Sequence, residues 1–294
     1  MHLGNALSAL LAWLDVRSAG GKLILRIEDL DIRARKRDVA DVLIDDLAWL
    51  GLTWDEGPFF QSERHAYYER ACAALTDKGL VYPCFCSRAE LHAAQAPHAS
   101  DGTFIYPGTC RHLTPQQIET LSAQKTPALR IRVTNTPISC MDERYGAWTE
   151  RLEESCGDIL IRRADDVWAY QLAVVVDDGE MGVTHVVRGH DLQGSVARQM
   201  YLQDLLGYSH PTYFHTPLLV DPSGRRLSKR DKDLDLGALQ EKGVQPEEII
   251  GFLASLLNLV PRETKLTAQE LISLFSWEKI AQQSSDIVVS EFPC

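Results

Sequence analysis

The sequence lacks the features of a membrane-spanning or secreted protein. No apolar run is long enough to cross a bilayer, and the apolar stretch from Ala6 to Leu14 has neither a basic leader nor a small-residue cleavage site. We therefore expect a cytoplasmic protein with no membrane partner. Seven cysteines, an odd number, argue against a disulfide framework and for thiols that are buried, free or metal-bound.

An excess of basic residues is also missing. Lys and Arg total 30 against 41 Asp and Glu, which gives a formal net charge of -11. This balance counts against extended, sequence-blind RNA binding. Three local basic runs, Arg33–Arg37, Arg162–Arg163 and Gly224–Lys232, could still contact phosphates, although each could equally be a solvated face.

What is present is the pattern of an α/β protein. A chain of 294 residues, 45% of them hydrophobic, can bury a large core. The spacing of apolar residues, and the glycines that follow several of these segments, predict helices over residues 6–19, 38–50, 63–78, 195–206, 247–259 and 268–275. They predict strands over residues 22–27, 128–133, 159–163 and 172–176, the last buried on both faces. This alternation favours a parallel sheet with helices on its faces, and no repeat interrupts it.

Two distant segments have the chemistry of a nucleotide site. His2-Leu3-Gly4-Asn5 precedes a helix, whose N-terminus can hold phosphates, and Gly4 allows close approach to the backbone. Arg226-Leu227-Ser228-Lys229-Arg230 follows a turn and offers an ammonium group to a triphosphate. By themselves these segments read as an unstructured terminus and a basic surface loop.

Two further segments carry groups suited to a small charged substrate. Arg26-Ile27-Glu28-Asp29 lies at the carboxyl end of a predicted strand, where ligands bind in open α/β sheets. The block from Trp168 to Gly189 contains Tyr170 and Arg188, and a guanidinium matches a carboxylate in two parallel bonds. The alternatives are a helix-capping carboxylate, a core tyrosine and a surface ion pair.

A cysteine cluster interrupts the apolar pattern between residues 81 and 111. Cys84-Phe85-Cys86 and Cys110 provide three closely spaced thiols, and structural zinc prefers four such ligands in a tetrahedron. General zinc chemistry suggests His98 or His112 as the fourth ligand. The other four cysteines (Cys72, Cys140, Cys156 and Cys294) stand alone, and a structural role or none is expected for them.

Taken in order, these segments resemble the class I aminoacyl-tRNA synthetases. Residues 2–5 match their HIGH-like motif and residues 226–230 their KMSKS-like motif, with Arg226 where the family usually has Lys. The resemblance implies a Rossmann-type catalytic domain, with His2, Gly4 and Lys229 binding ATP and with His2, Asn5 and Lys229 in catalysis. It also implies Mg²⁺ bound with ATP and held by the phosphates.

The Arg26-Ile27-Glu28-Asp29 motif and the Trp168–Gly189 block are similar to those of glutamyl-type synthetases. This resemblance implies that Glu28, Tyr170 and Arg188 bind L-glutamate. The Cys-x-Cys…Tyr-x-x-x-Cys pattern and the short C-terminal region are similar to the glutamyl-queuosine branch of the family. That branch implies one Zn²⁺ on Cys84, Cys86, Tyr106 and Cys110. It also implies activation of glutamate by ATP to glutamyl-adenylate, then transfer to the queuosine base at the wobble position of tRNA(Asp).

The expected organisation is a catalytic domain over residues 1–230, interrupted by a zinc-binding insertion at 81–125, then a short helical region over 231–294. We expect a monomer. The alternatives are a discriminating glutamyl-tRNA synthetase fragment and a catalytically impaired, zinc-bearing RNA-binding protein. In the family a strand and a turn precede the position of His2, so we expect Met1 to be an internal methionine and the first strand to be missing.

Overall fold

The computed structural model describes residues 1–31, 37–87, 89–90, 105–227, 234–281, 286–290 and 292. It divides into two compact units. Unit 1 comprises Met1–Phe60, Val187–His190 and Phe214–Cys294, and unit 2 comprises Gln61–Val186 and Asp191–Tyr213. The predictions for Lys229, His98, Cys294 and most of the Arg33–Arg37 run fall outside the described residues.

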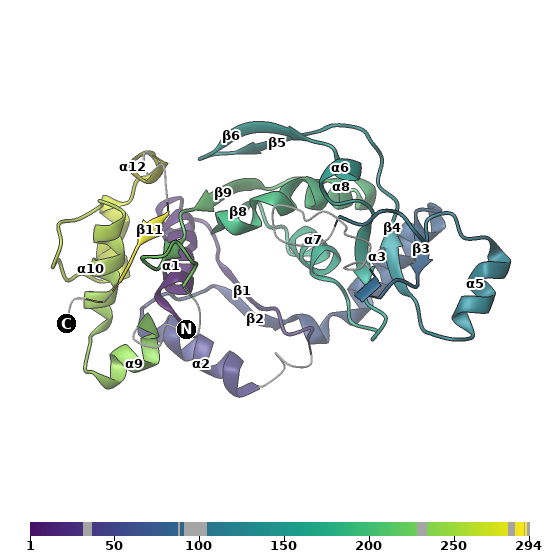
Figure 1. Cartoon of the computed structure of the whole chain (residues 1–294). Helices are drawn as coiled ribbons and strands as arrows, with labels where there is room; N and C mark the ends of the chain where they lie inside the picture. Colours follow the sequence, from purple (N-terminus) through teal and green to yellow (C-terminus); the bar gives the residue numbers. More distant parts are fainter. Residues whose placement is uncertain are drawn as a thin grey trace. The chain divides into compact units, whose positions relative to one another are not determined.

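Unit 1 combines helices with two pairs of parallel strands (Figure 1). The strands are β1 (Ile24–Ile27) with β2 (Glu56–Phe60), and β10 (Leu219–Val220) with β11 (Ile287–Val288). The helices are α1 (Leu3–Ser18), α2 (Arg37–Trp49), α9 (Leu236–Glu241), α10 (Pro246–Leu256), α11 (Ala268–Leu271) and α12 (Trp277–Ala281), with a 3-10 turn at Ile272–Leu274. Parallel pairing is what the alternation of helices and strands predicted.

Helix α1 forms the centre of the core of unit 1. Its apolar residues recur at helical spacing, and Leu3, Leu7, Leu10 and Leu14 are all fully buried. They pack in one cluster with residues of α10 such as Leu253. Burying a leucine side chain contributes about 1.5–3 kcal/mol, so this helix is held firmly from its first turn to Leu14.

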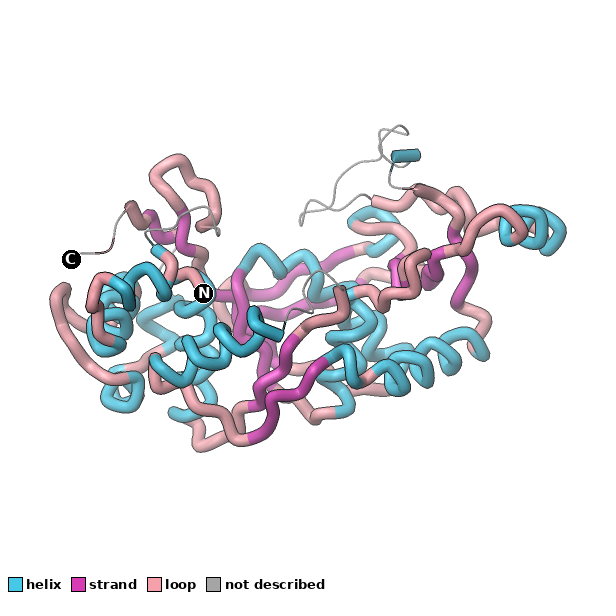
Figure 2. Tube along the Cα trace, turned by 90° about the horizontal axis from the view of Figure 1, so that it is seen from below, coloured by secondary structure: helices cyan, strands magenta, loops and turns pink. Residues whose placement is uncertain are grey.

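Unit 2 contains antiparallel sheets among helices, and the strands in both units are short (Figure 2). One sheet has the order β3 (Val81–Cys84), β4 (Ala128–Ile131), β7 (Ile159–Arg162), and a hairpin joins β5 (Ile138–Asp142) to β6 (Gly146–Glu150). The helices are α3 (His65–Asp77), α5 (Pro115–Ser122), α6 (Leu152–Ser155), α7 (Tyr170–Glu180) and α8 (Val196–Leu206), with 3-10 turns at Gln61–Glu63 and His190–Ser195. The paired strands β8 (His185–Gly189) and β9 (Thr212–Thr216) carry residues of both units.

The predicted strand at residues 172–176 is wrong, because these residues lie inside helix α7. All five are buried, from Leu172 to Val176. A helix that is apolar on every side is buried, and periodicity alone cannot separate such a segment from a strand buried on both faces. The β-branched run therefore misled the prediction.

A buried carboxylate fixes α7 within unit 2. Asp177 is fully buried and accepts hydrogen bonds from Gln61 Nε2 at 2.8 Å, Arg64 Nε at 2.6 Å and Tyr68 Oη at 2.7 Å. Three donors compensate the desolvation of its charge.

No helix in the described part of the chain has the length and apolarity that a membrane span needs.

Candidate functional site

The start of α1 and the hairpin after β10 meet in unit 1. A Cβ added at Gly4 would lie 3.9 Å from the Cβ of Leu219, so the first turn of α1 approaches strand β10 directly. From β10 the chain turns back, with Leu227 N donating to Leu219 O at 3.0 Å and Arg226 bridging Val220. Gly4, in the first turn of α1, and Arg226–Leu227, the described start of the Arg226–Arg230 segment, therefore both neighbour strand β10.

His2 is the N-cap of α1. Its Nδ1 accepts a hydrogen bond from Asn5 N at 3.3 Å, which leaves the proton of the neutral imidazole on Nε2. Because Asn5 N and Ala6 N donate to His2, it is the N–H groups of Leu3 and Gly4 that have no acceptor within the helix and point toward its N-terminus. The arrangement presents N–H donors and a partial positive charge, which suits a phosphate.

The hairpin that leads to Lys229 is organised by one carboxylate. Asp221 accepts hydrogen bonds from Ser223 Oγ at 2.5 Å, from the backbone N of Ser223 at 2.8 Å and from the backbone N of Arg225 at 3.0 Å. Its second oxygen accepts from the Arg225 guanidinium at 2.7 Å and 2.9 Å. These bonds, led by that from Ser223, hold the pKa of Asp221 well below its usual range. Lys229 itself lies outside the described residues.

Two of the predicted glutamate ligands belong to unit 1 and one belongs to unit 2. Glu28 directly follows β1, as predicted, and one of its oxygens lies 3.4 Å from Arg26 Nη2. Arg188 is half-buried on β8, in unit 1 like Glu28. Tyr170 is the first residue of α7 in unit 2 and is 36% exposed.

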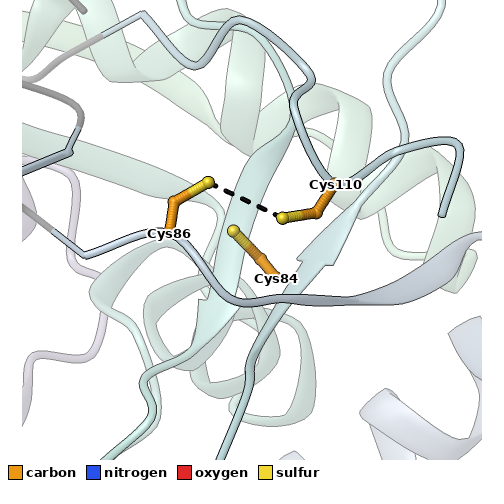
Figure 3. Close-up of side chains that lie close together, drawn as sticks. All are labelled: Cys84, Cys86 and Cys110. Carbon is orange, nitrogen blue, oxygen red and sulfur yellow. Dashed lines mark hydrogen bonds between the residues drawn. The ribbon is translucent and has the colours of Figure 1, made fainter. Parts of the chain in front are cut away.

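The three predicted thiols of unit 2 come together. The sulfurs of Cys84, Cys86 and Cys110 lie within 4.8 Å of one another and point toward a common centre (Figure 3). Cys86 and Cys110 Sγ are 3.6 Å apart. Strand β3 supplies Cys84, the following loop Cys86, and a turn after residue 105 supplies Cys110.

The hydroxyl of Tyr106 occupies the fourth side of this cluster. Its Oη lies 3.5 Å from Cys84 Sγ and 3.8 Å from Cys86 Sγ, and it accepts from Cys110 N at 2.8 Å. Ligands about 2.0–2.3 Å from a tetrahedral zinc are separated by about 3.3–3.8 Å, and the three separations of 3.5, 3.6 and 3.8 Å fall in this range. The exposed His112 is not in the cluster.

Backbone packing fixes Tyr106 in that position. Its N–H donates to Cys156 O at 3.1 Å, and Gly157 runs beside it with φ +66. A Cβ on Gly157 would lie 2.2 Å from the Tyr106 carbonyl oxygen, so the close approach requires glycine. The Arg130 guanidinium lies 3.9 Å from the centre of the Tyr106 ring.

The thiols have unequal electrostatic surroundings. Burial alone raises the pKa of Cys84, but the hydrogen bond with Tyr106 and the charge of Arg130 lower it overall. Burial, together with the negative charge of Cys84, raises the pKa of Cys86 to about 12. Cys84 therefore loses its proton more readily than Cys86, and a bound cation would favour the thiolate form of its ligands.

Sequence reasoning missed one polar residue near Arg188. His215 on β9 is fully buried, and its Nε2 accepts from Arg188 Nε at 3.1 Å. The available signal was a histidine inside an otherwise apolar and aromatic run, Tyr213-Phe214-His215. A polar ring at such a place has to find a partner.

Comparison with known proteins gives consistent matches over nearly the whole chain. Residues 1–291 match the catalytic domain of the class I tRNA synthetases (E and Q). A glutamyl-Q tRNA(Asp) synthetase from Symbiobacterium thermophilum is 47% identical over 297 residues, covering 96% of this chain and 91% of that protein. Another from Nitratidesulfovibrio vulgaris is 43% identical, covering 94% of this chain and 88% of that protein.

Solved structures show the same fold. A glutamate tRNA ligase from Elizabethkingia meningosepticum, in complex with its amino acid, matches with a TM-score of 0.80 at 24% identity. A glutamate-tRNA synthetase from Elizabethkingia anophelis matches with a TM-score of 0.81 at 25% identity. The chain spans 64% and 66% of the lengths of these two proteins. The chain belongs to the class I tRNA synthetases (E and Q), and within them to the glutamyl-Q tRNA(Asp) synthetases.

Proposed function

We propose that the protein activates L-glutamate with ATP to glutamyl-adenylate and transfers the glutamate to the queuosine base at the wobble position of tRNA(Asp). The observation that carries the proposal is the contact of the α1 N-terminus with the hairpin that begins the Arg226–Arg230 segment. Further support is that the chain is 47% identical to a glutamyl-Q tRNA(Asp) synthetase.

The proposed ATP site uses the start of α1. Gly4 leaves room for the nucleotide, and the Nε2–H of His2 donates to the phosphates. Asn5 is exposed in the same turn, and Lys229, two residues beyond Leu227 in the sequence, would supply a positive charge. Adenylation then depends on holding the glutamate carboxylate in line with the α-phosphate and on stabilising the charge that develops there. Mg²⁺ held by the ATP phosphates would offset part of that charge.

The proposed glutamate ligands have complementary charges. Glu28 suits the substrate ammonium group, and Arg188 suits the side-chain carboxylate, because a guanidinium can make two parallel bonds to it. Tyr170 keeps the hydrogen-bonding role that the family resemblance gives it. Discrimination against glutamine would follow, because an amide offers Arg188 no negative charge.

We also propose one structural zinc ion on Cys84, Cys86, Cys110 and Tyr106. The support is the fit of the three sulfurs and the Tyr106 oxygen to tetrahedral separations. The ion would cross-link the loop after β3 to the turn that carries Cys110. The zinc-bearing insertion over residues 81–125, the helical region over 231–294 and a monomeric, cytoplasmic enzyme stay predictions.

The first test is glutamate-dependent exchange of pyrophosphate into ATP without RNA. We expect exchange with glutamate and none above background with glutamine or aspartate. The second test is transfer of labelled glutamate to tRNA(Asp) with and without queuosine. Labelling is expected only of the queuosine-containing RNA.

The outcomes separate the proposed function from its alternatives. Labelling of tRNA(Glu) without labelling of tRNA(Asp) would identify a discriminating glutamyl-tRNA synthetase. A folded protein that binds RNA but shows no exchange would be a catalytically inactive RNA-binding protein. Either result would overturn the proposal.

A further inference from the structure

Arg188 makes a defined contact on its inner side. The side chain lies half-buried on β8, and its Nε–H donates to Nε2 of His215 at 3.1 Å. His215 lies on the paired strand β9 and is fully buried. A charged guanidinium at such a place needs a hydrogen-bond acceptor, and the imidazole nitrogen provides one.

The contact determines the protonation of His215. An arginine side chain has five N–H donors, no acceptor, and stays protonated in proteins. The bond therefore requires a lone pair on Nε2, and the proton of the neutral ring lies on Nδ1. A neutral imidazole orients the guanidinium without cancelling its charge.

The same contact fixes the plane of the Arg188 guanidinium. With Nε–H directed at His215, the planar fork is held in one orientation, and a fork of this kind matches a carboxylate in geometry. An arginine without this support would sample several rotamers and lose entropy on binding. A fixed orientation lowers that cost and favours a planar carboxylate over other groups.

Strand β9 holds His215 firmly. Its neighbour Phe214 stacks on Trp277 with ring centres 3.5 Å apart, and Trp277 Nε1 donates to Asp15 Oδ1 at 2.6 Å. Phe214 is 6% exposed. These contacts link β9 to α12 and α1 within unit 1, so the imidazole is supported by a packed core.

We propose that His215 is a positioning residue that aims the Arg188 guanidinium at the side-chain carboxylate of glutamate. The inference rests on the proposed function, in which Arg188 binds that carboxylate. It adds a specificity element that contacts the arginine and not the substrate. Its effect should be found in the KM for glutamate more than in the KM for ATP or in kcat.

The test compares two substitutions of His215 in the full chain by glutamate-dependent exchange. His215→Leu keeps bulk but removes the acceptor, and the KM for glutamate should rise about tenfold or more, the loss expected for a hydrogen bond to a charged group. The KM for ATP should change less than about threefold, well under that loss. His215→Gln retains an acceptor oxygen and should restore most of the affinity for glutamate.

Leu253→Ala is the matched control, because Leu253 is a fully buried residue of α10 in the same unit. It should lower the melting temperature without changing the KM for glutamate, which separates loss of stability from loss of positioning. An unchanged KM in His215→Leu, or His215→Gln no better than His215→Leu, would overturn the inference. If the wild-type protein shows no glutamate-dependent exchange, the proposed function itself fails.

Discussion

At the scale of single residues, the position of the His2 ring explains why residue 4 is a glycine. A Cβ at position 4 would lie 3.1 Å from both Cε1 and Nδ1 of the His2 ring, closer than ordinary contact. The His2 ring would have to move, and its hydrogen bond with Asn5 N would weaken. The glycine therefore sets the position of the imidazole as well as leaving room for a nucleotide.

We predict that Gly4→Ala separates stability from activity. Alanine in a helix is favoured over glycine by about 0.5–1 kcal/mol, so the melting temperature should stay the same or rise. The displaced His2 ring should raise the KM for ATP about fivefold or more, a modest loss of phosphate contact. Pyrophosphate exchange and thermal unfolding measure the two effects.

Ser18→Ala is the control for this substitution, because it also raises helix propensity within α1 but lies at the opposite end of the helix. Its KM for ATP should match that of the wild type. An unaltered KM in Gly4→Ala would show that the His2 ring position has no part in ATP binding.

Tyr106 is the second residue whose role can be tested directly. Tyr106→Phe keeps the ring beside Arg130 and removes only the oxygen that contacts Cys84 and Cys86. We expect at least about a tenfold faster loss of zinc to a chelator, because three ligands remain of four. Metal analysis during dialysis measures this.

Cys140→Ser is the matched control, since Cys140 is buried but outside the cluster. It should retain zinc at the wild-type rate. Equal retention by Tyr106→Phe, with loss of zinc in His112→Ala, would assign the fourth ligand to His112.

At the residue scale, the sequence predicted the thiol cluster but not the histidine that contacts Arg188. Cys84 and Cys86 cannot separate far, because they lie on a strand and its following loop, and the structure confirms that the turn carrying Cys110 brings a third thiol to them. His215 was not predicted. Its partner Arg188 is 27 residues away in sequence, and only the pairing of β8 with β9 brings them together.

At the scale of elements, β11 reinforces the hairpin that leads to Lys229. Ile287 N donates to Leu218 O and Val289 N to Val220 O, both at 2.8 Å, so β11 extends β10 in parallel. Just before β11, Asp286 Oδ1 accepts from Leu218 N at 3.0 Å and lies 2.7 Å from His190 Nε2. One carboxylate therefore links the segments that follow β8 and β9.

We predict that Asp286→Ala loosens this connection. Losing the acceptor for Leu218 N should cost about 1 kcal/mol of unfolding free energy, since both side chains of the His190 pair are about a third exposed. The KM for ATP should rise, because β10 positions the hairpin. Asp286→Asn keeps an oxygen for Leu218 N and should lie between Asp286→Ala and wild type. Identical unfolding curves and KM values for all three proteins would contradict the prediction.

Elements were predicted where periodicity was clear. The expected helix at 38–50 is α2, within one residue at each end, because its apolar residues keep a helical period and Gly51 follows it. The segment 172–176 failed because it has no polar face to define a period. The β5–β6 hairpin was also missed, because Gly146 occupies a turn that the surrounding sequence did not make evident.

At the scale of the whole molecule, negative charge limits how the protein can hold RNA. The net charge is -11, and the Arg162–Arg163 run is already paired with carboxylates. Arg162 pairs with Asp166, and Arg163 with Asp165. An arginine that is already paired with a carboxylate neutralises an RNA phosphate poorly, and few counterions are then released from the RNA. We therefore expect these two arginines to add little to RNA binding.

We therefore predict a shallow salt dependence for binding of tRNA(Asp). About four phosphate contacts would give a slope of roughly -3 in a plot of log affinity against log salt, or about a 60-fold loss between about 50 and 200 mM. Replacing both Arg162 and Arg163 by Ala should leave the slope unchanged, because their charges are already compensated. A slope near -7, or one that falls by about 2 in the double variant, would show that phosphates displace Asp165 and Asp166. That result would make the Arg162–Arg163 run part of the RNA-binding surface despite its carboxylate partners.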